Sequence, residues 1–185
     1  LKDSGVEWLG EVPEHWEVTA IKRICVLLRD GTHLPPPRTA EGFPLLSVRN
    51  IVAGKFGTRS DDSKISESDY HQLCRTFTPK ENDVLLAIVG ATMGKVAVVP
   101  KMGRFQIQRS LAIFRPRPDK LLFKFLAAYL GGPAFQRALW STVAFSAQPG
   151  IYLNTLGGFS IVLPSRQEQA AIVDYLDQAT ADIDT

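Results

Sequence analysis

The hydrophobic pattern of the chain predicts a set of short β-strands. Residues 84–89 (VLLAIV) are apolar without alternation, which is typical of a strand that is covered on both faces. Residues 96–99 form a second β-branched run, and residues 106–116 form a third, with polar and apolar side chains alternating at its start. A helical turn followed by a strand is expected over residues 21–29, and further strands are expected over residues 43–51 and 159–163.

Helical periodicity appears in two other parts of the chain. From Lys120 onward, apolar residues recur at i, i+1, i+4, i+5 and i+8, which indicates a helix that ends at the Gly-Gly pair 131–132. Pro133 then suits the first position of a following helix. A shorter helix is predicted to begin after Ser66, whose hydroxyl can cap it and which is followed by acidic residues in the first turn.

Residues 165–185 carry the clearest local signal. Ser165 and Glu168 fit the S-x-x-E capping box that begins a helix. Apolar residues then step by four, three and four positions, as in the a/d seam of a coiled coil, at Ile172, Leu176, Ala179 and Ile183. Two heptads alone do not establish a coiled coil, but an acidic helix with one apolar seam is expected to pack against a partner helix.

These patterns predict a mixed α/β (α+β) fold, in which a twisted, mostly antiparallel or mixed sheet carries flanking helices. At 185 residues the chain suits one globular domain with an appendage. We expect the domain over residues 1–164 and the start of a truncated helix, which would pack against a partner helix, over residues 165–185. Residues 1–19 are expected to be a lead-in segment that packs through Trp8 and Trp16.

Charge is distributed unevenly along the chain. The net charge of +2 combines −2 over residues 1–83, +9 over residues 84–167 and −5 over residues 168–185. A basic middle favours a polyanionic partner, and the acidic tail favours a separate role. The alternative is a set of solvated charged faces.

The connection between the strands expected at residues 84–89 and 96–99 has glycines and a lysine spaced almost as in a phosphate-binding loop. Gly90 to Lys95 reads GATMGK, with three residues between the glycines instead of four, and Val96 stands where Ser or Thr would hold magnesium. The next segment is strand-like rather than helical, so no helix N-terminus would receive a phosphate. The glycines are better explained by a tight turn between strands and by close backbone approach to a large ligand.

The positions of the cysteines and the hydropathy of the chain indicate the cellular compartment that suits the protein. Cys25 and Cys74 are far apart without CxxC spacing, so neither a disulfide framework nor a zinc site is expected, and a reducing cytoplasm is the default. No apolar run reaches membrane length, and no signal peptide is visible, so no membrane partner is expected. Because the chain starts without Met and ends within a pattern, it is interpreted as part of a longer protein.

Several stretches together resemble the specificity (S) subunit of Type I restriction-modification systems. They occur in the family order and span nearly the whole chain: SGVEWLGEVPEHWEV, DGTH, FPLLSVRNI, NDVLLAIVGATMGKVAVV, QRSLAIFRP, SAQPGIYLNTL and LPSRQEQAAIVDYLDQATADID. The resemblance implies a target recognition domain that reads one half of a bipartite double-stranded DNA sequence, followed by the start of a conserved helix.

The resemblance also implies partners and excludes catalysis by the chain itself. In that family the modification methyltransferase subunit carries S-adenosylmethionine, and the restriction subunit joins through the complex, so no cofactor is expected here. One recognition domain with a short helix implies either a fragment of a two-domain subunit or a half-subunit that forms a homodimer through the helix.

Candidate DNA-binding residues follow from chemistry rather than from transfer of family positions. Loop residues with cationic, amide or hydroxyl side chains are expected to line DNA: Thr32, His33, Arg38, Arg49, Asn50, Lys95, Arg104 and Gln148. Gln106, Gln108 and Arg109 could contribute from the third strand, since Gln pairs with adenine edges and Arg with guanine edges. For each of these residues a structural role is an equal alternative.

Two other functions remain open. The chain could be an interaction scaffold that acts through the apolar seam, with the basic middle only conferring solubility. A hydrolase would use His33 or His71 with a nearby Cys or Asp, but no spacing supports a catalytic triad. A basic concavity built from residues 30–59, 90–109 and 146–150 would favour DNA binding, whereas dispersed cations would favour the scaffold.

Overall fold

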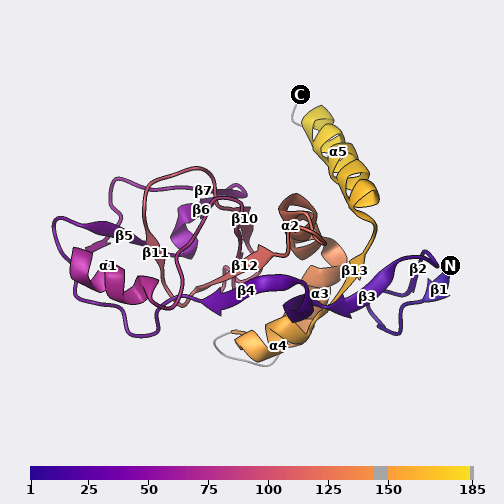
Figure 1. The fold of residues 1–185 in the computed structure, drawn as a ribbon, viewed down its shortest axis with the longest axis horizontal. Helices are drawn as coiled ribbons and strands as arrows, with labels where there is room; N and C mark the ends of the chain where they lie inside the picture. The colour runs from indigo at the N-terminus through magenta and orange to yellow at the C-terminus, as the bar shows by residue number, and fades with distance from the viewer. Residues whose placement is uncertain (144–149, 184–185) are drawn as a thin grey trace.

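The computed structural model describes residues 1–143 and 150–183, and its centre is a twisted six-stranded sheet (Figure 1). The strand order across this sheet is β4 (Cys25–Asp30), β12 (Leu111–Pro116), β9 (Val84–Ala87), β10 (Val96–Val98), β7 (Lys55–Phe56) and β6 (Ile51–Val52). Neighbouring strands are antiparallel except β10 and β7, which are parallel. The predicted mixed sheet with flanking helices is therefore confirmed.

Smaller sheets surround the central one. The strands β11 (Gln106–Ile107), β5 (Phe43–Leu46) and β8 (Lys64–Ile65) form a three-stranded sheet, and two pairs are formed by β13 (Ser160–Leu163) with β3 (Glu17–Ala20) and by β1 (Lys2–Asp3) with β2 (Glu11–Val12). The 3-10 helices are η1 (Ile21–Arg23) and η2 (Val48–Asn50). The α-helices are α1 (Glu67–Cys74), α2 (Phe123–Gly131), α3 (Pro133–Ser141), α4 (Leu153–Gly158) and α5 (Arg166–Ile183).

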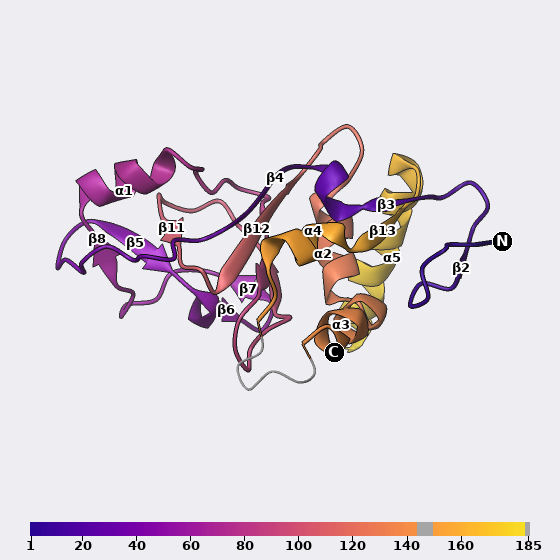
Figure 2. The ribbon, with the colours of Figure 1, turned by 90° about the horizontal axis from the view of Figure 1, so that it is seen from below.

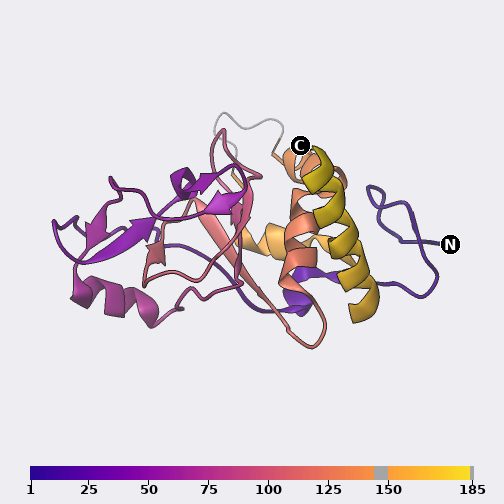
Figure 3. The ribbon, with the colours of Figure 1, turned by 90° about the horizontal axis from the view of Figure 1, so that it is seen from above.

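Strand β9 separates two hydrophobic clusters. Val84 and Leu86 face a cluster that includes α2, α3 and α4, whereas Leu85 and Ala87 face a cluster that includes β11 and β6. All four side chains are fully buried, as the run without alternation predicted. Figures 2 and 3 show the same division, with helices α2, α3 and α4 on one side and β5, β8, β11 and α1 on the other.

The predicted helix boundaries are confirmed where capping chemistry defines them. The Ser66 hydroxyl accepts a hydrogen bond from the Asp69 backbone N–H at the start of α1, and Pro133 is the first residue of α3. The Ser165 N–H donates to the Glu168 carboxylate and the Glu168 N–H donates to the Ser165 hydroxyl, which completes the capping box of α5. Among the helices of the described residues, none is long and apolar enough to cross a membrane.

Two of the predicted strands are broken. The strand expected over residues 43–51 ends at Leu46, because Ser47 and Asn50 exchange side-chain and backbone hydrogen bonds that begin η2. The strand expected over residues 106–116 is divided into β11 and β12 by a turn in which the Leu111 N–H donates to the Gln108 carbonyl. The alternating polar and apolar side chains predicted at the start of this strand therefore do not lie on one continuous strand. Helix α4 was not predicted.

The lead-in segment packs through its aromatic residues, as predicted. The Trp8 ring lies 6.3 Å from the rings of Tyr129 and Phe159, measured between centroids, and 6.4 Å from that of Phe135. The Trp16 indole N–H donates to the Glu168 carboxylate at 3.1 Å. These contacts attach the N-terminus to helices α2, α3 and α5.

A buried ion pair lies where β9 begins. The Arg115 guanidinium donates to both oxygens of the Asp83 carboxylate at 2.7 Å and also reaches the Thr78 carbonyl. Asp83 is 1% exposed, and its carboxylate also accepts the Lys80 backbone N–H. The fully bonded arrangement is required because an unpaired charge at this depth would be costly.

Removal of this carboxylate should destabilise the domain. We expect Asp83→Ala to lower the free energy of unfolding by about 3 kcal/mol, because Arg115 then loses its charge partner in a largely buried site. The matched control is Asp119→Ala, since the Asp119–Arg117 pair is exposed on both sides and should contribute less than about 0.5 kcal/mol. Urea denaturation of both variants measures the difference, and equal effects would contradict the structural role.

Candidate nucleic-acid interface

Four surface segments meet at one end of the central sheet. Strands β4 and β9 end there, and β12 and β10 begin there: Ala112 pairs with Asp30, Leu111 with Ala87, and Val96 with Leu86. We call residues 30–33, 47–50, 88–95 and 107–110 the loop cluster. Adjacent strands are spaced by about 4.8 Å, so the connections of β4, β12, β9 and β10 lie side by side.

Backbone hydrogen bonds hold segments 30–33 and 107–110 of the loop cluster together. The Thr32 N–H donates to the Ile107 carbonyl at 3.0 Å, and the Arg109 N–H donates to the Thr32 carbonyl at 3.2 Å. Gly31 is required here, since a Cβ atom would lie 2.2 Å from the Ile107 carbonyl oxygen. Thr32, Gln108 and Arg109, three of the predicted site residues, are thereby brought together.

The β9–β10 connection is tied to helix α3. Gly90 and Gly94 both have positive φ angles, so they form the tight turn that the sequence predicted. The Gln136 side chain donates to the Gly94 carbonyl at 2.9 Å, and a Cβ atom on Gly94 would lie 2.3 Å from the Gln136 oxygen. Gly94 is therefore required for its close contact with α3. Close backbone approach to a large ligand, which the sequence also suggested, stays a prediction. Lys95 follows this anchored turn and is exposed.

The segment around η2 is rigid below its exposed arginine. The Val48 N–H donates to the Ser110 hydroxyl, which links η2 to the 107–110 turn. The Asn50 amide is 2% exposed and donates to both oxygens of Asp62 at 2.9 Å and to the Gly57 carbonyl at 3.0 Å. Asn50 is therefore occupied structurally, while Arg49 lies at the surface in an ion pair with Asp61.

The predicted residues differ in how available their charges are. Lys95 and Arg109 are exposed, and neither forms an ion pair within the described ranges. Arg49 shares the Asp61 carboxylate with Arg59, which holds the pKa of Asp61 below its usual value. His33 contacts the Asp30 carboxylate at 2.5 Å. The contacts of these side chains with Asp30 and Asp61 were not predicted from the sequence. The i, i+3 spacing of Asp30 and His33 was a signal for the first contact, and no local signal indicated the contact with Asp61.

Other predicted residues lie away from the loop cluster. Arg38 precedes Thr39, which bridges to Lys64 in the three-stranded sheet, and Arg104 is exposed beside α1. Gln106 is 2% exposed and donates to the Phe77 carbonyl at 2.7 Å, so burial removes its amide from the surface. Gln148 lies outside the described residues. The structure therefore gathers six candidates: Thr32, His33, Arg49, Lys95, Gln108 and Arg109.

A basic concavity, which would favour DNA binding, is supported only in part by the described residues. Two cations of the basic middle form ion pairs with acids from elsewhere in the chain: Arg115 with Asp83 and Lys124 with Asp177. A cavity of about 260 Å³ lies below Thr32 and His33, and Gln106 forms part of its wall. This small hollow, together with the exposed cations Lys95 and Arg109 elsewhere in the loop cluster, is the part of the pattern that the described residues support.

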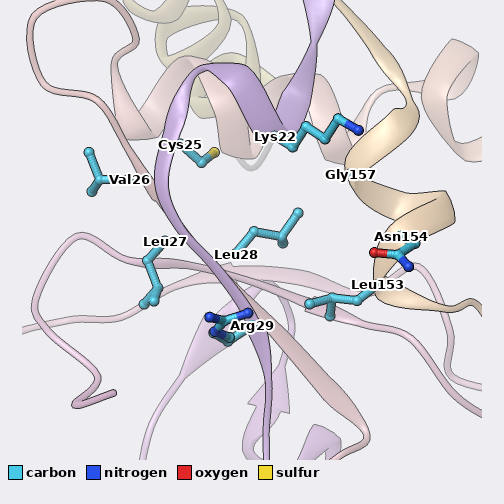
Figure 4. Close-up of a pocket in the computed structure, with 9 residues that line it drawn as sticks. All are labelled: Lys22, Cys25, Val26, Leu27, Leu28, Arg29, Leu153, Asn154 and Gly157. Atoms are coloured by element: carbon cyan, nitrogen blue, oxygen red, sulfur yellow. The ribbon is translucent and has the colours of Figure 1, made fainter. Parts of the chain in front are cut away.

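A second cavity, of about 300 Å³, lies between β4 and α4 (Figure 4). Lys22 and Arg29 line it, together with the thiol of Cys25. Burial raises the pKa of this thiol to about 12, so it is protonated at neutral pH and is a poor nucleophile. In the part of the chain that the structure describes, no cluster of three or more His, Cys, Asp or Glu residues could hold a metal ion.

The predicted helical seam divides between two environments. Ile172 packs partly against the body of the domain, next to the buried Val173. Leu176 is 40% exposed and Tyr175 is 69% exposed, so this part of α5 presents apolar surface to the outside. Ala179 is half-buried, and the side chain of Ile183 lies outside the described residues. Pairing with a partner helix stays a prediction.

Comparison with known proteins identifies specificity subunits as relatives. The Type I restriction enzyme EcoBI specificity subunit of Escherichia coli is 29% identical over 177 residues, which cover 94% of this chain and 37% of that protein. The EcoKI specificity subunit of Escherichia coli K12 is 25% identical over 191 residues, which cover 97% of this chain and 39% of that protein. The chain thus spans about two fifths of the length of these curated relatives.

Solved structures share the fold, and a family model covers most of the chain. The HsdS subunit from Thermoanaerobacter tengcongensis superposes with a TM-score of 0.68 at 22% identity, over 94% of this chain and 39% of that chain. The Type I restriction-modification S subunit from M. genitalium gives a TM-score of 0.58 at 18% identity, over 90% of this chain and 40% of that chain. The model for the Type I restriction modification DNA specificity domain matches residues 13–185, and the chain therefore belongs to that family.

Proposed function

We propose that this chain recognises one half of a bipartite double-stranded DNA target, as part of the specificity subunit of a Type I restriction-modification complex. The observation that carries the proposal is the loop cluster, where Thr32, Gln108, Arg109, Arg49 and Lys95 converge on one sheet end. Arginine, lysine, amide and hydroxyl groups on adjoining loops suit both phosphate contacts and base edges. Family membership supports the same conclusion.

In this proposal the chain binds DNA and partners but performs no chemistry. A modification methyltransferase subunit would supply S-adenosylmethionine and transfer the methyl group, and a restriction subunit would join through the complex. We place the protein in the cytoplasm, where its DNA target would be accessible and where two unpaired thiols are stable. Domain 1–164 would read the bases, and helix 165–185 would serve assembly.

A second function, an interaction scaffold that acts through α5, is favoured by one observation. Tyr175 and Leu176 are exposed apolar side chains in the middle of this helix. The two functions are compatible, since α5 could bind a second copy or a partner subunit while the loop cluster binds DNA. If the chain acted only as a scaffold, the sequence preference of DNA methylation would not depend on this domain.

Methylation mapping tests the proposal directly. The full-length protein would be expressed with its modification subunit in a host that lacks other methylation, and modified bases would be located by sequencing. We expect one bipartite motif, of which one half changes when the loop cluster is replaced by that of a relative with another specificity. Methylation that is independent of the loop cluster, or no modified motif, would overturn the proposal.

Salt dependence separates phosphate contacts from base contacts at Arg109. If its guanidinium binds a phosphate, Arg109→Ala should weaken binding to all sequences and reduce the slope of log Kd against log salt by about one. If it reads a base, the variant should lose about 1–3 kcal/mol for the target and relax one position.

Fluorescence anisotropy with target and scrambled duplexes measures both effects, using the complex with the modification subunit. The control is Arg117→Ala, which removes an exposed arginine beyond the opposite end of β12. The two variants should differ, and equal losses would contradict a specific role for Arg109.

A further inference from the structure

The buried side-chain amide of Gln169 attaches the start of helix α5 to the body of the domain. Gln169 is fully buried, and its side-chain oxygen accepts the Leu122 N–H at 2.9 Å, while its nitrogen donates to the Lys120 and Pro164 carbonyls at 2.9 Å each. All three hydrogen bonds that this amide makes go to backbone groups of two different segments. Gln169 therefore fixes one point of the helix, about which the helix could still tilt.

The neighbouring residue, Glu168, makes a second set of contacts, which reach the lead-in segment. One oxygen of the Glu168 carboxylate lies 2.6 Å from the His15 imidazole and 3.1 Å from the Trp16 indole nitrogen, while the other accepts the Ser165 N–H at 2.9 Å. These hydrogen bonds, that from His15 first, hold the pKa of Glu168 at about 2, so the group is charged at neutral pH. Glu168 thus links α5 to the lead-in segment, whose Trp8 is packed on α2 and α3.

Geometry explains why a second tie matters. Helix α5 has 18 residues and is therefore about 27 Å long. A tilt of about 7° at its base would move its far end by about 3.4 Å, which is the rise of one base pair. Beyond Val173 the side chains are mostly exposed, and Lys124–Asp177 is a surface ion pair. An ion pair that is exposed on both sides contributes little. The direction of the exposed part, seen in Figure 1, therefore depends mainly on the contacts at the base of the helix, which are those of Glu168, Gln169 and the buried Val173.

We propose that Glu168 is a positioning residue: through His15 and Trp16 it fixes the direction of α5 relative to the loop cluster, and so the distance between this half-site and the second one. The inference rests on the proposed function. The hydrogen bonds of Gln169 hold one point of the helix, and the contacts of Glu168 with His15 and Trp16 prevent the helix from tilting about that point. Neither residue contacts DNA, so the bases read by the loop cluster are independent of this junction.

The test uses methylation mapping with the full-length protein and its modification subunit, on plasmids whose half-sites are one base pair closer or further apart than in the native target. The double variant His15→Ala/Trp16→Phe removes both donors but keeps the capping box and an aromatic ring at position 16. We expect the preference for the native spacing to fall about fivefold, a modest effect because exposed ion pairs and their hydrogen bonds contribute little. The half-site bases should stay unchanged.

Two further variants make the result specific. Glu168→Gln removes the charge and keeps one acceptor oxygen, which can serve either the Trp16 or the Ser165 donor but not both, so it should give an intermediate preference. Glu67→Ala removes another exposed His–Glu pair, with His71 on helix α1, and it should keep the native spacing preference. Unchanged spacing preference in the double variant would overturn the inference, as would loss of base preference in a variant that melts at the wild-type temperature.

A distance measurement distinguishes failure of this inference from failure of the proposed function. Spin labels on Thr58→Cys and Gln178→Cys, both at exposed positions, would be placed in full-length protein lacking the two native cysteines. The double variant should broaden the distance distribution by about 3 Å, the displacement that a 7° tilt gives over the helix length. If the distance distribution of the double variant were as narrow as that of the wild type, the positioning role of Glu168 would be refuted, even if no DNA methylation were found. A wild-type complex that methylates no bipartite site would instead overturn the proposed function.

Discussion

Burial of β9 and β12 on both faces is the constraint on which the rest of the domain depends. Val84, Leu86, Ala112 and Phe114 are fully buried against the helices, while Leu85, Leu111 and Ile113 are fully buried against the opposite cluster. A sheet of this kind must be covered on both sides, so the helices and the small sheets occupy its faces. Its ends are the part left for loops, and the polar candidates collect at one of them.

Sequence reasoning succeeded where the signal was local. The apolar run of β9, the glycine turn after it, Pro133 and the Ser165 capping box each depend on residues within one or two turns, and the structure confirms each. It failed where distant partners decide the outcome. Residues 106–116 form two strands because β11 pairs with β5, whereas β12 pairs with β4 and β9, and nothing within the segment specifies this division.

The site was predictable in its chemistry but not in its geometry. Asn50 and Gln106 have the side chains of DNA-reading residues, but Asp62 and the Phe77 carbonyl, 12 and 29 positions away, satisfy them inside the domain. Segment charge misled in the same way: Asp83 lies just before the basic middle and Asp177 lies after it, yet both neutralise its cations. Only the folded arrangement separates the exposed Lys95 and Arg109 from arginines that stabilise the domain.

The way in which the loop cluster is held has an evolutionary consequence. Its framework consists of main-chain contacts among Thr32, Ile107 and Arg109, of the close backbone approach at Gly31 and of the tight turn at Gly94, and the outward side chains of Lys95 and Arg109 add nothing to it. Substitutions at these outward positions leave the hydrophobic clusters and the junction with α5 untouched. Under the proposed function, a change of target sequence through these outward side chains would cost little in folding, whereas changes at the glycines or at the helix junction would disturb the scaffold.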